Sequence, residues 1–249
     1  DGGRRRVYSA PFIPHATLCA ALLVFAAPAS ALAAEIKAGV AKELFALPRW
    51  VPLAGYSKRH GAPSRGSHDP VGARALVIED GRTTVALVSC DLLIIDEPLF
   101  DAVRRRLLAS GLPDDLELVL AATHTHSGPG AYGTRFLEKL SMGHFDPAVL
   151  EELVRAITQA VLRAHGSLSP VRMASMSTMT DGLVKNRVDP DGLAEAELIV
   201  CAFYREAESA PFAILMNFSA HPTTLGAWNM ELSADYPGVA VDAVERRVS

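Results

Sequence analysis

Three histidines at the ends of apolar segments are the residues whose types and spacing could do chemistry. His124 and His126 follow the apolar run LELVLAAT and precede a Ser-Gly-Pro-Gly turn, and His221 follows a second apolar run, PFAILMNFS. Side chains at positions i and i+2 of a strand point to the same face, so we expect His124 and His126 to face the same way. A His-x-His pair with a distant histidine suits Zn²⁺, which binds imidazole and keeps an open position in catalytic sites.

Two aspartates and an arginine could support this site. Asp91 follows a third apolar run, TTVALVSC, and ligands of open α/β sheets bind at the carboxyl ends of strands. A carboxylate often fixes the orientation of a metal-bound imidazole, a role open to Asp91 and Asp235. Asp235 could instead cap the last helix, which its position before Pro237 favours. Arg187 could hold a carbonyl oxygen or a carboxylate, or it could simply be solvated.

A single histidine at a strand end is more often a hydrogen-bonded loop residue than a metal ligand. Three histidines and an aspartate at predicted strand ends favour a metal site over that simpler interpretation.

The segments around these residues alternate between predicted strands and helices. The strands ARALVIED and TTVALVSCD flank an Asp-Gly turn, which predicts a hairpin. Two helices begin at the N-caps Asp96 and Asp146, with proline in the first turn and glycine at the end. Further strands are predicted at VRMASMSTMT, ELIVCAFYRE and PFAILMNFSAH, and a last helix at YPGVAVDAVERRV. Residues 36–69 read as a long irregular loop, and such loops are often functional. The pattern predicts an α/β fold with a mixed sheet flanked by helices.

The first 34 residues have the features of a secretory signal peptide. Three arginines, Arg4 to Arg6, precede the apolar segment LCAALLVFAA, and the small residues of PASALAAE follow it. This order predicts cleavage near Ala33 or Ala34, a mature domain over residues 35–249, and a secreted or periplasmic protein. The alternative is an N-terminal membrane anchor, for which the apolar run is short.

Composition narrows the classes of partner. The formal net charge is −4 and there is no basic patch, so we expect no nucleic-acid binding. Two cysteines lie in the mature part, Cys90 and Cys201. An exported protein could join them in a disulfide, and two separate buried thiols are the alternative.

Three segments together resemble the neutral/alkaline non-lysosomal ceramidases, most closely the shorter bacterial members. They are THTHSGPG (123–130), the Asn186-Arg187 pair, and AHPTTLG followed by SADYPG (220–238); the resemblance covers residues 37–249. It implies a zinc amidohydrolase that cleaves the amide of an N-acyl sphingoid base. By this resemblance His124 and His221 would bind the zinc, His126 would lie beside it, and Arg187 would bind near the scissile amide.

The chain ends at Ser249, whereas the family's remaining ligands lie further downstream. We therefore expect a metallohydrolase-like domain that is incomplete at its C-terminus, with weak metal binding and little turnover in isolation. The expected partner is a lipid or another N-acyl small molecule, with contact to a membrane surface; no oligomeric state is indicated. Two alternatives stay open: a zinc hydrolase of another N-acyl, amide or ester substrate, and a non-catalytic zinc-binding domain if the natural chain ends at Ser249.

Overall fold

The computed structural model describes residues 35–48, 50–189 and 191–248. The predicted signal peptide, residues 1–34, lies outside this part, so the leader, the anchor alternative and the export stay predictions. Among the described residues, no helix has the length and apolar content needed to cross a membrane.

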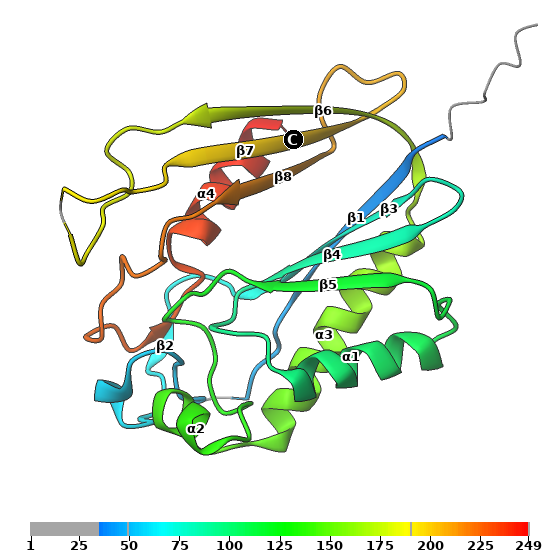
Figure 1. The fold of residues 1–249 in the computed structure, drawn as a ribbon. Helices are drawn as coiled ribbons and strands as arrows, with labels where there is room; N and C mark the ends of the chain where they lie inside the picture. Colours follow the sequence, from blue (N-terminus) through cyan, green and yellow to red (C-terminus); the bar gives the residue numbers. More distant parts are fainter. Residues whose placement is uncertain (1–34, 49, 190, 249) are drawn as a thin grey trace, which may run out of the picture. The chain divides into compact units, whose positions relative to one another are not determined.

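A seven-stranded mixed sheet organises the domain (Figure 1), which confirms the predicted α/β class. The strand order is β5-β4-β3-β1-β6-β7-β8. Neighbouring strands are antiparallel except for β4 and β5, which are parallel. The strands are β1 (Lys37–Leu44), β3 (Gly72–Glu79), β4 (Thr84–Cys90), β5 (Glu117–Ala122), β6 (Ser169–Met179), β7 (Glu197–Arg205) and β8 (Ala213–Phe218).

The sheet has two arms that meet at one short joint. β1 and β6 pair only through Lys37 with Pro170 and Ala38 with Ser169, whereas β1 pairs with β3 along its whole length. The arm β1-β3-β4-β5 and the arm β6-β7-β8 pack on each other near this joint through Ala38, Leu76 and Phe203. Strands β5 and β8 lie at opposite ends of the strand order. Because the joint is so short, the loops that follow these two strands can approach one another (Figure 1).

Two long helices cover one face of the first arm. Helix α1 (Glu97–Ala109) and helix α3 (Pro147–His165) enclose the main apolar core with β1, β3 and β4. Both predicted N-caps are confirmed: the carboxylates of Asp96 and Asp146 accept hydrogen bonds from the backbone N–H of Leu99 and Ala148, at 3.0 and 2.9 Å. Capping and apolar periodicity therefore place these two helices as the sequence predicts.

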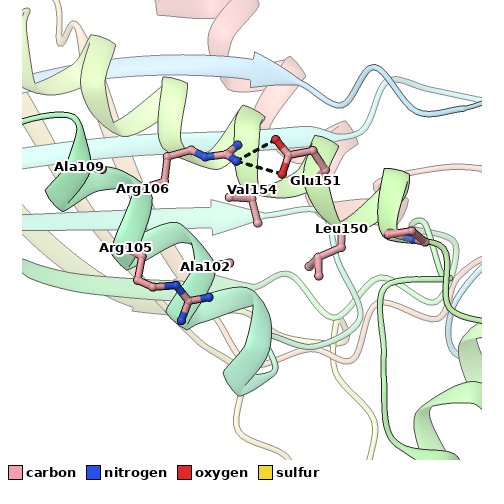
Figure 2. Close-up of a pocket in the computed structure, with 8 residues that line it drawn as sticks. Ala102, Arg105, Arg106, Ala109, Leu150, Glu151 and Val154 are labelled. Carbon is pink, nitrogen blue, oxygen red and sulfur yellow. Dashed lines mark hydrogen bonds and ion pairs between the residues drawn. The ribbon is translucent and has the colours of Figure 1, made fainter.

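A pocket lies between these helices (Figure 2). The ion pair of Arg106 with Glu151, at 2.8 Å, spans it, and Arg105 lines it together with small and apolar side chains such as Ala102 and Val154. No predicted site residue lines this pocket, so the chemistry must be sought elsewhere.

The prediction of a long irregular loop over residues 36–69 is wrong in part. Residues 36–69 contain strand β1, a single 3₁₀ turn η1 (Ser57–Arg59) and strand β2 (Gly66–Ser67). Strand β2 pairs with β9 (Glu231–Leu232). The sequence of β1, KAGVAKEL, has weak strand propensity. Its eight-residue pairing with β3 supplies the order that the local sequence does not.

Helix α2 (Phe136–Met142) was not predicted, whereas the last helix, α4 (Asp235–Val248), was. Glu245 of α4 forms an ion pair with Lys42 of β1 at 2.8 Å. Cys90 and Cys201 are free thiols in β4 and β7, which confirms that they are separate, but only Cys90 is buried as predicted, because Cys201 is half-buried. Burial raises the pKa of Cys90.

Candidate metal centre

The three predicted histidines converge, although they lie on segments far apart in the chain. Side-chain nitrogens of His124, His126 and His221 all lie within 4.8 Å of one another. The Nε2 atoms of His126 and His221 are 2.9 Å apart, and the ring centroids of the trio are 4.8 to 5.1 Å apart. The fold thus assembles a compact imidazole cluster from the loop after β5 and the loop after β8.

A loop, rather than a strand, presents His124 and His126. Strand β5 ends at Ala122, and His124 has a left-handed backbone with φ of 64°. Strand alternation is therefore the wrong reason for their common direction. The backbone N–H groups of Thr123 and His124 instead donate to the carbonyls of Cys90 and Leu92, at 2.8 and 3.0 Å, so the loop follows the end of β4.

The ring of His124 is oriented by a backbone carbonyl. Its Nδ1 lies 2.6 Å from the carbonyl oxygen of Leu93. A carbonyl only accepts, so Nδ1 carries the proton in this hydrogen bond and the neutral ring keeps an Nε2 lone pair for a ligand. The carbonyl of Leu93 therefore orients His124, a role that the sequence predicted for a carboxylate.

His126 lies in the most enclosed part of the cluster. The ring of Tyr56 packs against it at 4.8 Å, and a Cβ on Gly55 would come within 2.6 Å of its Nδ1. That Nδ1 is buried without a hydrogen-bond partner. Burial lowers the pKa of His126 to about 4, helped by His124, His221, Arg59 and Arg187. The imidazole is consequently neutral, and able to bind a cation, well below neutral pH.

His221 sits on a loop that a buried aspartate holds in place. Asp235, with φ of 56° and 3% exposure, accepts hydrogen bonds from the Thr224 hydroxyl and from the backbone N–H of Leu225 at 3.0 Å. It also accepts from Tyr236 N–H at 2.6 Å and is itself the first residue of α4, so its role as the cap of this helix stays a prediction. Burial lowers the pKa of His221, as does the charge of His124.

Asp91 is buried but directs its hydrogen bonds to β3. Its Oδ2 accepts from the backbone N–H of Gly72 and from Arg74 Nη1, at 2.9 and 3.0 Å. Burial raises the pKa of Asp91, and the nearby Arg74 opposes this rise. Its predicted support of the metal stays a prediction; what the structure shows is that it joins the ends of β3 and β4.

Arg187 lies in the exposed loop between β6 and β7. The side chain of the preceding Asn186 shapes this loop, because its Oδ1 accepts from the N–H groups of Val188 and Asp189, each at 3.0 Å. The positive charge of Arg187 contributes to the lowered pKa values of His126 and His221. The arginine is therefore within electrostatic reach of the cluster, and its contact with substrate stays a prediction.

Two site residues were missed by the sequence analysis, Tyr56 and Arg59. Tyr56 packs on His126, and the buried guanidinium of Arg59 donates to the carbonyl of His126. Both belong to the segment predicted as an irregular loop, where no periodicity or spacing marks a functional side chain. The only signal was the general tendency of long loops to carry function.

The donor set fits a divalent metal ion such as Zn²⁺. Zinc binds imidazole nitrogen at about 2.0 to 2.1 Å, and three imidazoles converge here. His124 has its Nδ1 engaged with a carbonyl, and His126 and His221 bring two Nε2 atoms together. Two neutral imidazoles can share one hydrogen bond at most, whereas a cation can accept a lone pair from each. The division into ligands His124 and His221 and a neighbour His126 stays a prediction.

Comparison with known proteins identifies the family of the chain. The family model described as "Neutral/alkaline non-lysosomal ceramidase, N-terminal" matches residues 49–249. The neutral ceramidase of Pseudomonas aeruginosa is 30% identical, over 80% of this chain and 32% of its own length. The neutral ceramidase of Mycobacterium tuberculosis is 26% identical, over 79% of this chain and 33% of its own length. The chain thus spans about a third of the length of these curated relatives.

The fold is also similar to solved structures. The crystal structure of neutral ceramidase from Pseudomonas aeruginosa superposes with a TM-score of 0.79 at 28% identity, covering 86% of this chain and 36% of that one. A structure titled "Ceramidase complexed with C2" superposes with a TM-score of 0.78 at the same identity and coverage. The matched residues 49–249 include the histidine cluster, the loop of Arg187 and Asp235, and the chain belongs to the neutral/alkaline non-lysosomal ceramidase family.

Proposed function

We propose that this protein is part of a zinc-dependent amidohydrolase that cleaves the amide bond of an N-acyl sphingoid base. The single observation that carries the proposal is the convergence of His124, His126 and His221 within the segment that matches the ceramidase family. Relatives named neutral ceramidases support amide hydrolysis and a ceramide-like substrate.

The residues of this chain would share the work as follows. A zinc ion bound by the histidines would polarise a carbonyl and lower the pKa of a water molecule. His124, oriented by Leu93, and His221, on the loop held by Asp235, would hold the ion. His126 is neutral near pH 7 because of its lowered pKa, so its lone pair could accept a hydrogen bond from the attacking water or from the substrate. Arg187 would bind the amide or the developing negative charge.

Exposed apolar side chains on the loops around the site support a lipid substrate. Leu183, Val188 and Leu193 lie on the loop of Arg187, and Trp228 lies on the loop that follows His221; they are 68 to 92% exposed. Side chains of this kind suit acyl chains or a membrane surface. We include peripheral membrane contact in the proposal on this basis.

A substrate panel tests this function. The purified protein is incubated with an N-acyl sphingosine, an N-acyl amino acid and a simple ester, and the release of the fatty acid is measured. A chelator is then added, followed by Zn²⁺. Because this chain spans about a third of the length of its relatives and little turnover is expected of it in isolation, we expect slow release from the N-acyl sphingosine that the chelator stops and Zn²⁺ restores. Preference for another compound would assign a different substrate, and no zinc-dependent release from any of them contradicts the hydrolase.

We also propose that the protein is exported, because residues 1–34 have the order of a signal peptide. Expression of the complete chain in a bacterium, followed by N-terminal sequencing of the exported material, tests this. Cleavage near Ala33 or Ala34 is the expected result, and an uncleaved cytoplasmic protein contradicts it.

A further inference from the structure

Arg59 is a buried cation in the single turn η1, next to the histidine cluster. Its guanidinium donates from Nη1 to the carbonyls of Ala54 at 3.1 Å and His126 at 2.5 Å, and from Nη2 to the carbonyl of Gly226 at 3.3 Å. The same guanidinium lies 4.9 Å from the ring centre of Tyr56. One side chain therefore contacts three backbone segments that are otherwise far apart in the sequence.

These segments are the ones that carry the cluster. His126 itself is on the loop after β5, and Gly226 follows His221 on the loop after β8. Tyr56, under the guanidinium, packs on the His126 ring, and its hydroxyl donates to the carbonyl of Leu225 at 3.4 Å. Arg59 and Tyr56 thus both connect the loop of His126 with the loop of His221.

Arg59 differs from most buried arginines, which pair with a carboxylate. Within residues 35–48, 50–189 and 191–248, no carboxylate lies within ion-pair distance of it: every ion pair of the described chain is made by other residues. Its Nε is buried without a partner, and burial lowers its pKa. Burying an unpaired charge is costly. Arginine suits the position because its planar fork can reach several fixed carbonyls at once.

We propose that Arg59 is the positioning residue that sets the separation between the His126 loop and the His221 loop, and thereby the affinity of the cluster for Zn²⁺. This inference rests on the proposed metal site, because the spacing of the two loops matters for function only if the histidines bind one ion. Arg59 holds the backbone of both loops. Its charge also lowers the pKa of His126 and by itself would disfavour a cation, so weaker Zn²⁺ binding without Arg59 would report the positioning effect rather than the charge.

The test compares three variants. Arg59→Met keeps the side-chain length but removes the donors, and Arg59→Lys keeps the charge without the fork. Arg172→Met is the matched control: Arg172 also donates to a carbonyl, that of Glu208, and also stacks on a tyrosine, Tyr204, but it lies on β6 with partners outside the cluster.

Two quantities are measured for each protein. Hydrogen exchange of the metal-free protein reports the opening of residues 124–128 and 220–230. Competition with a chromophoric chelator reports the Zn²⁺ dissociation constant. We expect Arg59→Met to speed exchange in both loops by on the order of tenfold or more and to raise the dissociation constant by about 10- to 100-fold. Arg59→Lys should lie between Arg59→Met and the parent, and Arg172→Met should match the parent.

The outcomes separate this inference from the metal proposal. Unchanged exchange in both loops for Arg59→Met, an unchanged dissociation constant, or equal effects of Arg172→Met would each overturn the role of Arg59. If Arg59→Met does not fold, Arg59→Lys decides, and parent-like values for it overturn the inference. If the parent protein binds no Zn²⁺ while exchange in Arg59→Met rises, the metal proposal fails but Arg59 still sets the loop arrangement.

Discussion

His126 and His221 are 95 positions apart in the chain, and their Nε2 atoms lie 2.9 Å apart. One ring comes from the loop after β5 and the other from the loop after β8, strands at opposite ends of the sheet order. Without a cation, one of the two nitrogens must donate a proton to the other. The contact therefore makes the cluster sensitive to metal, to pH and to the residues that hold the two loops.

The histidines themselves give the first prediction. His124→Ala and His221→Ala each remove an imidazole from the cluster, so each should weaken Zn²⁺ binding by more than the roughly 10- to 100-fold typical for loss of an outer hydrogen-bond partner. Chelator competition measures this. His144→Ala, an exposed histidine outside the cluster, is the control and should bind Zn²⁺ like the parent. Equal Zn²⁺ affinities for the parent and the three variants would contradict a metal site at these histidines.

The lowered pKa of His126 predicts a pH-dependent stability of the metal-free protein. The folded state holds this histidine neutral to about pH 4, whereas the ordinary pKa is 6.5. Between these values the unfolded chain binds the extra proton, so the contribution of His126 is complete above pH 6.5 and is lost as pH falls toward 4. Urea unfolding from pH 7.5 to 4.5 measures it. The parent should lose more stability over this window than His126→Gln, and parallel profiles would contradict the prediction.

Gly55→Ala should disturb the His126 ring directly. Gly55 has φ of 106°, and an added Cβ would meet the Nδ1 of His126 at 2.6 Å. Gly81→Ala is the matched control, since Gly81 also has positive φ, 81°, but nothing lies within 4 Å of its added Cβ. Both variants should lose about 1 to 2 kcal/mol of unfolding free energy from backbone strain. Only Gly55→Ala should also weaken Zn²⁺ binding, and equal binding by the two variants would count against the contact.

Asp235→Asn tests the support of the His221 loop. The amide cannot accept all the hydrogen bonds that the buried carboxylate accepts from Thr224, Leu225 and Tyr236, so we expect a loss of about 1 to 3 kcal/mol in unfolding free energy and weaker Zn²⁺ binding. Asp80→Asn, in an exposed turn where Asp80 accepts from two backbone N–H groups, should leave metal affinity unchanged. An unaltered Zn²⁺ affinity in Asp235→Asn would show that Asp235 contributes to folding stability but not to metal binding.

Arg187 should affect turnover without weakening the metal. Arg187→Met removes a positive charge that disfavours cations near His126 and His221, so Zn²⁺ affinity should stay equal or rise. Loss of a group that stabilises developing charge should lower kcat/KM for the N-acyl substrate by about 10²-fold. Lys185→Met, exposed on the same loop, is the control. A parent-like kcat/KM in Arg187→Met would show that the arginine only borders the site.

Most of the fold could be predicted from local sequence. The caps Asp96 and Asp146 and the apolar spacing of α1 and α3 mark those helices in the local sequence. Strand β1 could not be predicted, because its weak propensity is overcome by pairing with β3. Helix α2 was missed for a related reason: it is only seven residues long, too short to show a clear period.

By itself, the sequence indicated which residue types could form the site: His124, His126 and His221 are recognisable from motif spacing and from the resemblance to the ceramidases, and they converge in the structure, whereas the role of Arg187 stays a prediction from that resemblance. The tertiary structure alone decided how the three histidines meet. The short joint between β1 and β6 lets the two arms bring the loops of His126 and His221 together, and the carbonyl of Leu93, the carboxylate of Asp235 and the guanidinium of Arg59 then hold them. Such contacts depend on the relative placement of distant segments, which local propensity does not encode.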